Sequence, residues 1–187
     1  MYLMMANKNN QNGRSMIEML GVLAIVGVLS AGGIAGYSVA MKSHKVNKTI
    51  DMIQFISTQV KGLYSGDFAD ISCKKLGDLG YLSAEYYDST QTGDAACIAA
   101  PVGDSWKIAQ KSGDSSRYQI FINDVEKAAC VKLAQVNWGE SAIFESFAVG
   151  GTIVNGLSGN ERVKPTVSDA AAACSSEDAN NLVWTFK

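Results

Sequence analysis

The chain has 187 residues, of which 47% are hydrophobic and 18% are charged. This length suits one globular domain together with an apolar segment, and the composition is not that of a disordered protein. With 16 Lys and Arg against 18 Asp and Glu, the formal net charge is -2. Binding of nucleic acid by bulk electrostatics is therefore not indicated.

The first predicted element is an apolar helix over 19–41. These residues read MLGVLAIVGVLSAGGIAGYSVAM and include no charged side chain. At ~1.5 Å per residue, a helix of this length spans the core of a bilayer. A helix buried in a soluble protein is one alternative, but this segment is apolar on every side. A secretory signal peptide is another, with Ser30-Ala31-Gly32 imitating a cleavage site, but its apolar core would be shorter. The sequence predicts a transmembrane helix.

A carboxylate, Glu18, lies at the edge of this apolar run. Drawing a carboxylate into hydrocarbon costs about 2.5–3.5 kcal/mol or more, so Glu18 needs a partner or a functional reason. Cleavage after Gly13 would create an α-amino group at Arg14, one helical turn away, which could pair with Glu18 of the same chain or of a neighbouring copy. The cut would also place Glu18 in the first turn of a helix, where the macrodipole favours negative charge.

The stretch NGRSMIEMLGVLAIVGVLSAGGIAGY resembles the N-terminus of type IV pilins, in which a Gly precedes five residues ending in Glu and then about twenty apolar residues. The resemblance implies a leader over 1–13, cleavage between Gly13 and Arg14 by a prepilin peptidase, and methylation of the new amine of Arg14. It also implies that Glu18 neutralises the N-terminal amine of an adjacent subunit, with Met16 and Ile17 beside it in the assembly helix.

The segment departs from the family pattern in two places. Arg14 stands where Phe, Met or Leu is usual, and the apolar helix has no Pro. Gly32, Gly33 and Gly36 are expected to supply the pliability instead, because Gly weakens a helix interior by about 1 kcal/mol. Gly32 and Gly36 also form a small-xxx-small pair that suits close helix contact.

The resemblance implies a route from membrane to filament. The chain would reside in the bacterial inner membrane with its N-terminus facing the cytoplasm, and would then join an extracellular pilus at the cell surface. The implied partners are other copies of the chain, the prepilin peptidase, the pilus assembly machinery of the inner membrane and, before assembly, membrane lipid.

The helical pattern continues beyond the apolar run. Apolar residues recur at three- and four-residue steps at 46, 50, 53, 56, 60 and 63, and Gly62 and Gly66 close the segment. We therefore expect one helix from about Ser15 to Tyr64, within a segment 14–64 whose second half backs a globular head.

Residues 65–187 are expected to form that head, with an α+β fold. Short stretches alternate or carry β-branched and aromatic residues, as strands do, at 106–108, 118–122, 151–154 and 182–186. A second helix is predicted from an N-cap at Asn123, with Glu126 three residues later, up to Gly139. The predicted architecture is a pilin fold, in which a long N-terminal helix packs on a small antiparallel sheet with a second helix.

Four cysteines lie in the head, far apart and without a CxxC motif. An exported domain favours disulfides, and spacing alone leaves three pairings open; four free thiols would conflict with a membrane span. The head resembles type IVb pilins in having one cysteine on a mid-domain helix and another before the final strand. This implies a bridge between Cys130 and Cys174, and a second between Cys73 and Cys97.

Enzymatic chemistry is not indicated. His44 is the single histidine, so neither a His-based nucleophilic triad nor a multi-histidine metal site can form. There is no phosphate-binding GxxxxGK[ST] motif. Clustered Asp, Asn and Ser residues could ligate calcium, but ordinary turn chemistry explains them without an EF-hand pattern. No cofactor or metal is expected.

The sequence therefore predicts a structural subunit that polymerises through its N-terminal helix into a pilus, serving adhesion, aggregation, motility or conjugation. Three alternatives stay open: a minor pilin or tip adhesin, a pseudopilin of a type II secretion system, and a membrane-anchored binding domain that never polymerises.

Overall fold

A computed structural model describes residues 16–98, 100–138, 143–158 and 161–187. By its contacts the chain divides into two compact units after Met41, so residues 16–41 and the head, residues 42–187, are described separately. One helix, α1 (Met16–Leu63), contributes to both units. The predicted Gly13 and Arg14 cleavage site lies outside the described residues.

Residues 16–41 are helical throughout, and every one of their side chains is exposed. By length and composition alone, α1 could cross a membrane. Apolar residues dominate this part of α1, and the first buried side chain of the helix is Val46, in the head.

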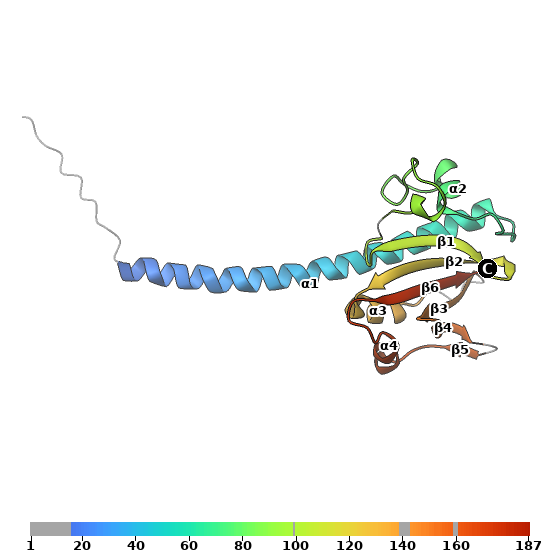
Figure 1. The fold of residues 1–187 in the computed structure, drawn as a ribbon. Helices are drawn as coiled ribbons and strands as arrows, with labels where there is room; N and C mark the ends of the chain where they lie inside the picture. The colour runs from blue at the N-terminus through green and yellow to red at the C-terminus, as the bar shows by residue number, and fades with distance from the viewer. Residues whose placement is uncertain (1–15, 99, 139–142, 159–160) are drawn as a thin grey trace, which may run out of the picture. The chain divides into compact units, whose positions relative to one another are not determined.

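The described part of the head contains a six-stranded antiparallel sheet in the order β1-β2-β6-β3-β4-β5 (Figure 1). Its strands are β1 (Ser105–Lys111), β2 (Asp114–Val125), β3 (Phe144–Val149), β4 (Thr152–Ser158), β5 (Glu161–Val163) and β6 (Asn180–Phe186). The last strand in sequence, β6, thus lies between β2 and β3 and completes the sheet. The predicted α+β class with an antiparallel sheet is confirmed.

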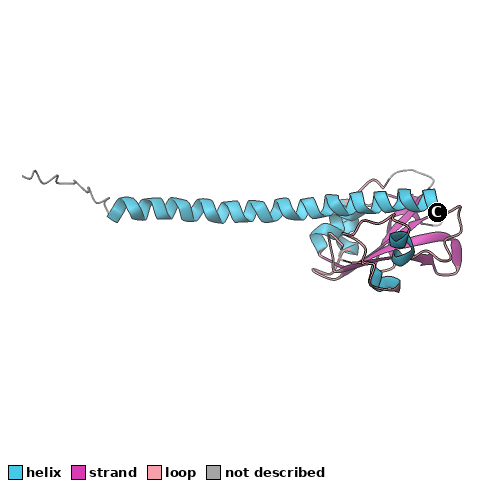
Figure 2. Ribbon diagram, turned by 90° about the horizontal axis from the view of Figure 1, so that it is seen from above, coloured by secondary structure: helices cyan, strands magenta, loops and turns pink. Residues whose placement is uncertain are grey.

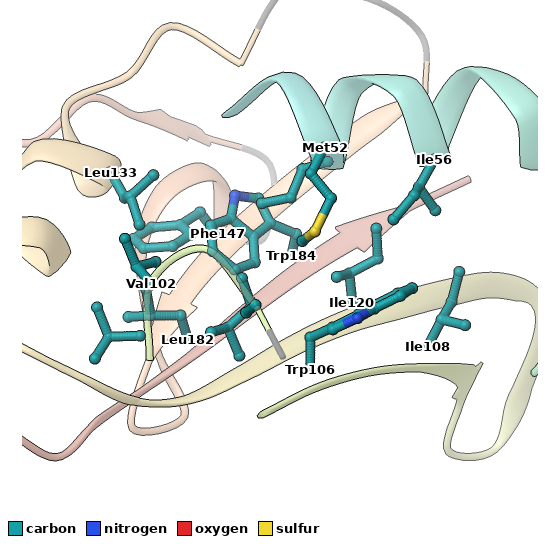
Figure 3. Packing of buried hydrophobic residues seen from close by; sticks show 14 of the residues in the cluster. Met52, Ile56, Val102, Trp106, Ile108, Ile120, Leu133, Phe147, Leu182 and Trp184 are labelled. Atoms are coloured by element: carbon teal, nitrogen blue, oxygen red, sulfur yellow. The ribbon is translucent and has the colours of Figure 1, made fainter. Parts of the chain in front are cut away.

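The core of the head forms where the C-terminal half of α1 packs on one face of the sheet. Figure 2 shows this half of α1 alongside the strands. In Figure 3, Met52 and Ile56 point from α1 toward sheet residues that include Ile120 and Trp184. Ile56, Ile120 and Trp184 are at most 1% exposed. Because side chains alternate along a strand, the even-numbered positions of β2 from Tyr118 to Ile122 supply the buried face.

Four further helical segments surround the sheet in the described residues: α2 (Cys73–Asp78), the 3₁₀ segment η1 (Gly93–Ala96), α3 (Lys127–Ala134) and α4 (Val167–Ala173). The sequence did not predict α2 or α4. Both are short, and each begins at a hydroxyl N-cap, Ser72 for α2 and Thr166 for α4. Thr166 and Asp169 form a capping box, a local signal that was present in the sequence.

The predicted start of the second helix at Asn123 is wrong. Asn123 pairs with Ser105 in the sheet, β2 continues to Val125, and α3 begins at Lys127. Strand pairing overrides the local capping signal here, because the pairing satisfies backbone groups of a segment whose Val125 is fully buried. The helix also ends at Ala134, before the predicted Gly139, where the Asn155 side-chain amide donates to the carbonyl of Ala134 at 2.9 Å.

Candidate functional site

The predicted assembly residues Met16, Ile17 and Glu18 lie at the N-terminal end of α1. Met16, Ile17 and Glu18 occupy its first turn, where Glu18 is the acidic residue. The exposed N–H groups of a first turn carry a partial positive charge, so an acidic side chain at this position stabilises the start of the helix. Arg14, the predicted partner and methylation site, lies outside the described residues.

The apolar side chains of residues 16–41 are left exposed by the described residues of the chain. Met16 is 86% exposed and Val28 is 75% exposed, and the same holds along the whole segment. A Cβ placed on Gly32 or Gly36 would meet no atom within 4 Å. Exposed apolar area on this scale is not stable in water, so the segment requires lipid or other protein helices around it.

Two disulfides hold the head, and all four cysteines of the sequence take part in them. Cys130 on α3 bonds Cys174 at the end of α4, with Cα atoms 5.9 Å apart, and Cys73 on α2 bonds Cys97 after η1, with Cα atoms 5.4 Å apart. This is the pairing that the resemblance implies. The first bridge fixes α4 just ahead of β6. The second closes the segment 64–104, which has little regular structure of its own.

The proximal end of the head, defined as the end where α1 enters it at Lys42, contains a cavity of about 290 Å³. Its charged lining consists of Lys42, Lys45, Asp104, Asp124 and Glu126. Lys42 Nζ lies 3.0 Å from Glu126 Oε2. With three carboxylates against two ammonium groups, the cavity carries one net negative charge.

The backbone around this cavity is tightly constrained. Asp124 has a φ of 56°, a left-handed conformation that is uncommon for a residue other than Gly. Opposite it, Gly103 has a φ of 75°, and a Cβ there would lie 2.3 Å from the carbonyl oxygen of Asn123. The amide of Asp104 donates to that same carbonyl at 3.1 Å. These contacts hold Asp104, just before β1, and Asp124, near the end of β2, at the cavity.

The distal end of the head, where α1 finishes at Leu63, carries a charged network. Arg117 of β2 bonds the carboxylates of both Asp114 and Glu145, and so bridges β2 and β3 across β6. Hydrogen bonds from Ser116, and then the Arg117 guanidinium, lower the pKa of Asp114 to about 2. The network joins the ends of β2 and β3.

Sequence reasoning missed the proximal cavity. Gly103-Asp104-Ser105 has the composition of a turn, and the sequence predicted a helix cap at Asn123, next to Asp124. No local pattern brings these two segments together, since their proximity depends on the pairing of β1 with β2. The Gly103-Asp104 dipeptide was the available signal, but it predicts a turn rather than a site.

Metal binding finds no geometric support in the part of the chain that the structure describes. No group of three or more His, Cys, Asp or Glu side chains is arranged there to hold an ion. His44 is exposed on α1.

Comparison with known proteins identifies relatives of the whole chain. The profile of the family described as Bundlin matches residues 38–187. A protein of Escherichia coli O127:H6 named "Major structural subunit of bundle-forming pilus" is 28% identical over 189 residues, covering 96% of both chains. A protein of the same name from Escherichia coli O111:H- is 28% identical over 191 residues, with the same coverage.

Two solved structures are also similar to this chain. A type IV pilin from the Vibrio cholerae El Tor biotype is 14% identical with a TM-score of 0.49, covering 77% of this chain and 98% of that one. A type IV b pilin from Salmonella typhi is 14% identical with a TM-score of 0.49, covering 76% and 97%.

Proposed function

Because the chain belongs to the Bundlin family, we propose that it is a structural subunit of a type IV pilus, polymerised with other copies of itself into an extracellular surface filament. The predicted resemblance to type IV pilins is confirmed by this family membership. The relatives are named as structural subunits, and no catalytic role is proposed.

One observation carries the proposal: a wholly exposed apolar helix precedes a well-packed, disulfide-bonded head in the same chain. The helix needs two successive environments, lipid before assembly and other helices within the filament, and its apolar side chains suit both. The head has its own core and disulfides, which suit a subunit exposed outside the cell.

Processing at the N-terminus is part of the proposal. A prepilin peptidase cuts between Gly13 and Arg14, the new amine of Arg14 is methylated, and the subunit waits in the inner membrane for the assembly machinery. The position of Glu18 in the first turn of α1 supports this route. In the filament, Glu18 pairs with the N-terminal amine of a neighbouring copy, and this pairing offsets the cost of placing a carboxylate among apolar helices.

The test is a Glu18→Ala strain compared with the parent. We expect the variant subunit to reach the membrane in normal amounts and to retain both disulfides, while surface filaments are lost. Normal filaments from this strain would contradict the proposal. Glu18→Asp serves as the matched control, because it keeps the charge and should restore part of the yield. Mass spectrometry of sheared parent filaments should find a chain that begins at Arg14.

A further inference from the structure

The head has two chemically different ends along the axis of α1. Lys42 lies at the proximal end and Lys61 at the distal end, about 28 Å apart at the rise of an α-helix. Strand β1 runs in the same direction, since Asp104 precedes it at the proximal cavity and Lys111 ends it at the distal side (Figure 1).

At the proximal end, two carboxylates lack a cationic partner. Glu126 is paired with Lys42, but Asp104 and Asp124 are exposed and form no ion pair within the described residues. The constrained backbone at Gly103 and Asp124 holds both beside the cavity. The proximal end therefore presents two fixed carboxylates at a concave surface, with Lys45 as the remaining cation of the lining.

At the distal end, two ammonium groups lack an anionic partner. Lys61 is exposed, Lys111 is partly exposed, and neither forms an ion pair in the portion of the chain that the structure covers. The neighbouring carboxylates Asp114 and Glu145 both bond Arg117, whose single positive charge offsets one of their two negative charges. A further carboxylate, Asp67, accepts a hydrogen bond from the amide of Ala69.

A helical filament requires a head-to-tail interface, in which two different surfaces of the same molecule are complementary. We infer that the distal Lys61 and Lys111 of one head dock at the proximal cavity of a second copy, against Asp104 and Asp124. The two ends of one head are too far apart for these groups to meet within a chain, so only a second copy can bring them together.

The cavity suits this occupant. Its volume of about 290 Å³ admits the tip of a lysine side chain, whose flexible stem carries a compact charge with three donors. Lys42 is neutralised by Glu126, and Lys45 offsets one of the two other carboxylates, so the cavity keeps one negative charge in excess. Charge pairs of this kind add modestly to affinity, but they fix register and disfavour the wrong orientation. Such pairs would orient each head as the helix α1 is inserted.

This inference rests on the proposed function, because it assumes a filament of parallel copies. The direct test treats intact parent filaments with a carbodiimide, which joins a lysine amine and a carboxylate into an amide when the two are in contact. Peptide mass spectrometry should recover a link between Lys61 or Lys111 and Asp104 or Asp124. The pairs Lys42–Glu126 and Lys127–Glu177, each 3.0 Å apart within one head, serve as internal controls for the reaction. Recovery of the control links without any distal-to-proximal link would overturn the inference and leave the pilus function intact.

Charge reversal gives an independent test. Lys61→Glu and Lys111→Glu should each lower the yield of sheared filaments about fivefold, because each places like charges against the proximal carboxylates of the next copy. Asp104→Lys should lower the yield similarly, and the combination of Lys111→Glu with Asp104→Lys should restore it. Asp67→Lys is the matched control: it makes the same charge change as Asp104→Lys but at the lysine end, and should leave the yield unchanged.

Each variant is first checked for folding by the amount of disulfide-bonded subunit in the membrane. Unchanged subunit with reduced filaments, and rescue by the double reversal, supports the inference. Normal filaments in all single variants, or equal loss with Asp67→Lys, contradicts it. Absence of filaments from the parent strain would instead contradict the proposed function, so the two failures are distinguishable.

Discussion

Residues 16–41 and residues 42–187 differ in the burial of their apolar side chains, which are exposed in the first segment and largely buried in the second. In the first segment every side chain is exposed, and the described residues bury none of the apolar ones. In the head, the aromatic and aliphatic side chains form one buried cluster that includes the second half of α1. One continuous helix thus changes its environment near Met41 without changing its backbone conformation.

Because of this contrast, we expect substitutions in the two segments to have different effects, one on association and the other on the stability of the head. Changes in 16–41 should alter what the chain associates with and leave the folding of the head untouched, because every side chain of that segment is exposed. Changes in the core of the head alter its free energy of unfolding, and affect assembly only through the supply of folded subunit. The predictions below address this separation in order of decreasing effect.

Removing residues 1–41 should yield a water-soluble head. Burial of apolar surface contributes about 25 cal/mol per Å², so the loss of the uncovered segment removes the main drive into lipid. We expect the head to be monomeric, with both disulfides formed and native-like circular dichroism. An insoluble or unfolded product would show that the two units are energetically coupled.

Trp184→Ala should destabilise the head by about 3–5 kcal/mol. Trp184 is fully buried on β6 and packs against Phe147, with ring centroids 4.9 Å apart, and against Trp138 at 5.4 Å. Trp184→Phe is the conservative control and should cost less, because the indole N–H has no hydrogen-bond partner among the described residues. Leu23→Ala in the exposed segment should leave the free energy of unfolding of the head within about 0.5 kcal/mol of the parent. Urea titration measures the free energy of unfolding of the head in each of the three variants.

The two disulfides should differ in where they act. The Cys130–Cys174 bridge closes a separation of 44 residues and the Cys73–Cys97 bridge one of 24, which gives roughly 4 and roughly 3.5 kcal/mol in the chain-entropy model. Replacing Cys73 and Cys97 by Ser should open the segment 64–104 to limited proteolysis while β6 stays protected. Replacing Cys130 and Cys174 should expose β6 as well. Identical cleavage patterns from both pairs would rule out this local division.

Periodicity and composition were sufficient for the large elements. The three- and four-residue spacing predicted a helix from about Ser15 to Tyr64, and α1 runs from Met16 to Leu63. Strands rich in β-branched and aromatic residues were found near β1, β2, β4 and β6. Strand β3 was missed although its Phe144 and Phe147 are buried. Its neighbour β5 has three residues, Glu161–Val163, which is too short for a periodic signal.

Contacts between distant segments were beyond sequence reasoning. The placement of β6 between β2 and β3 depends on tertiary packing, and so does the meeting of Asp104 with Asp124 at the proximal cavity. A local signal was misleading at Asn123. The sequence there has a helix-capping pattern, but the residue pairs with Ser105 in the sheet instead. The processing site at Gly13 remains a prediction from the motif alone.

The smallest expected effect concerns acid stability of the head. The pKa of Asp114 is lowered to about 2 by Ser116 and Arg117, against about 3.9 in an unfolded chain. A lowered folded-state pKa contributes stability that is fully present above the unfolded value and is lost as pH falls toward 2. Asp114→Asn should therefore make the head less stable than the parent at pH 7, and this difference should shrink between about pH 4 and pH 2.

Ser116→Ala should produce a smaller change of the same sign, because it removes the hydroxyl that donates to Asp114 at 2.6 Å but keeps Arg117. Thermal unfolding of the disulfide-bonded head across this pH range measures both, and a difference that stays constant down to pH 2 would show that Asp114 is not the titrating group.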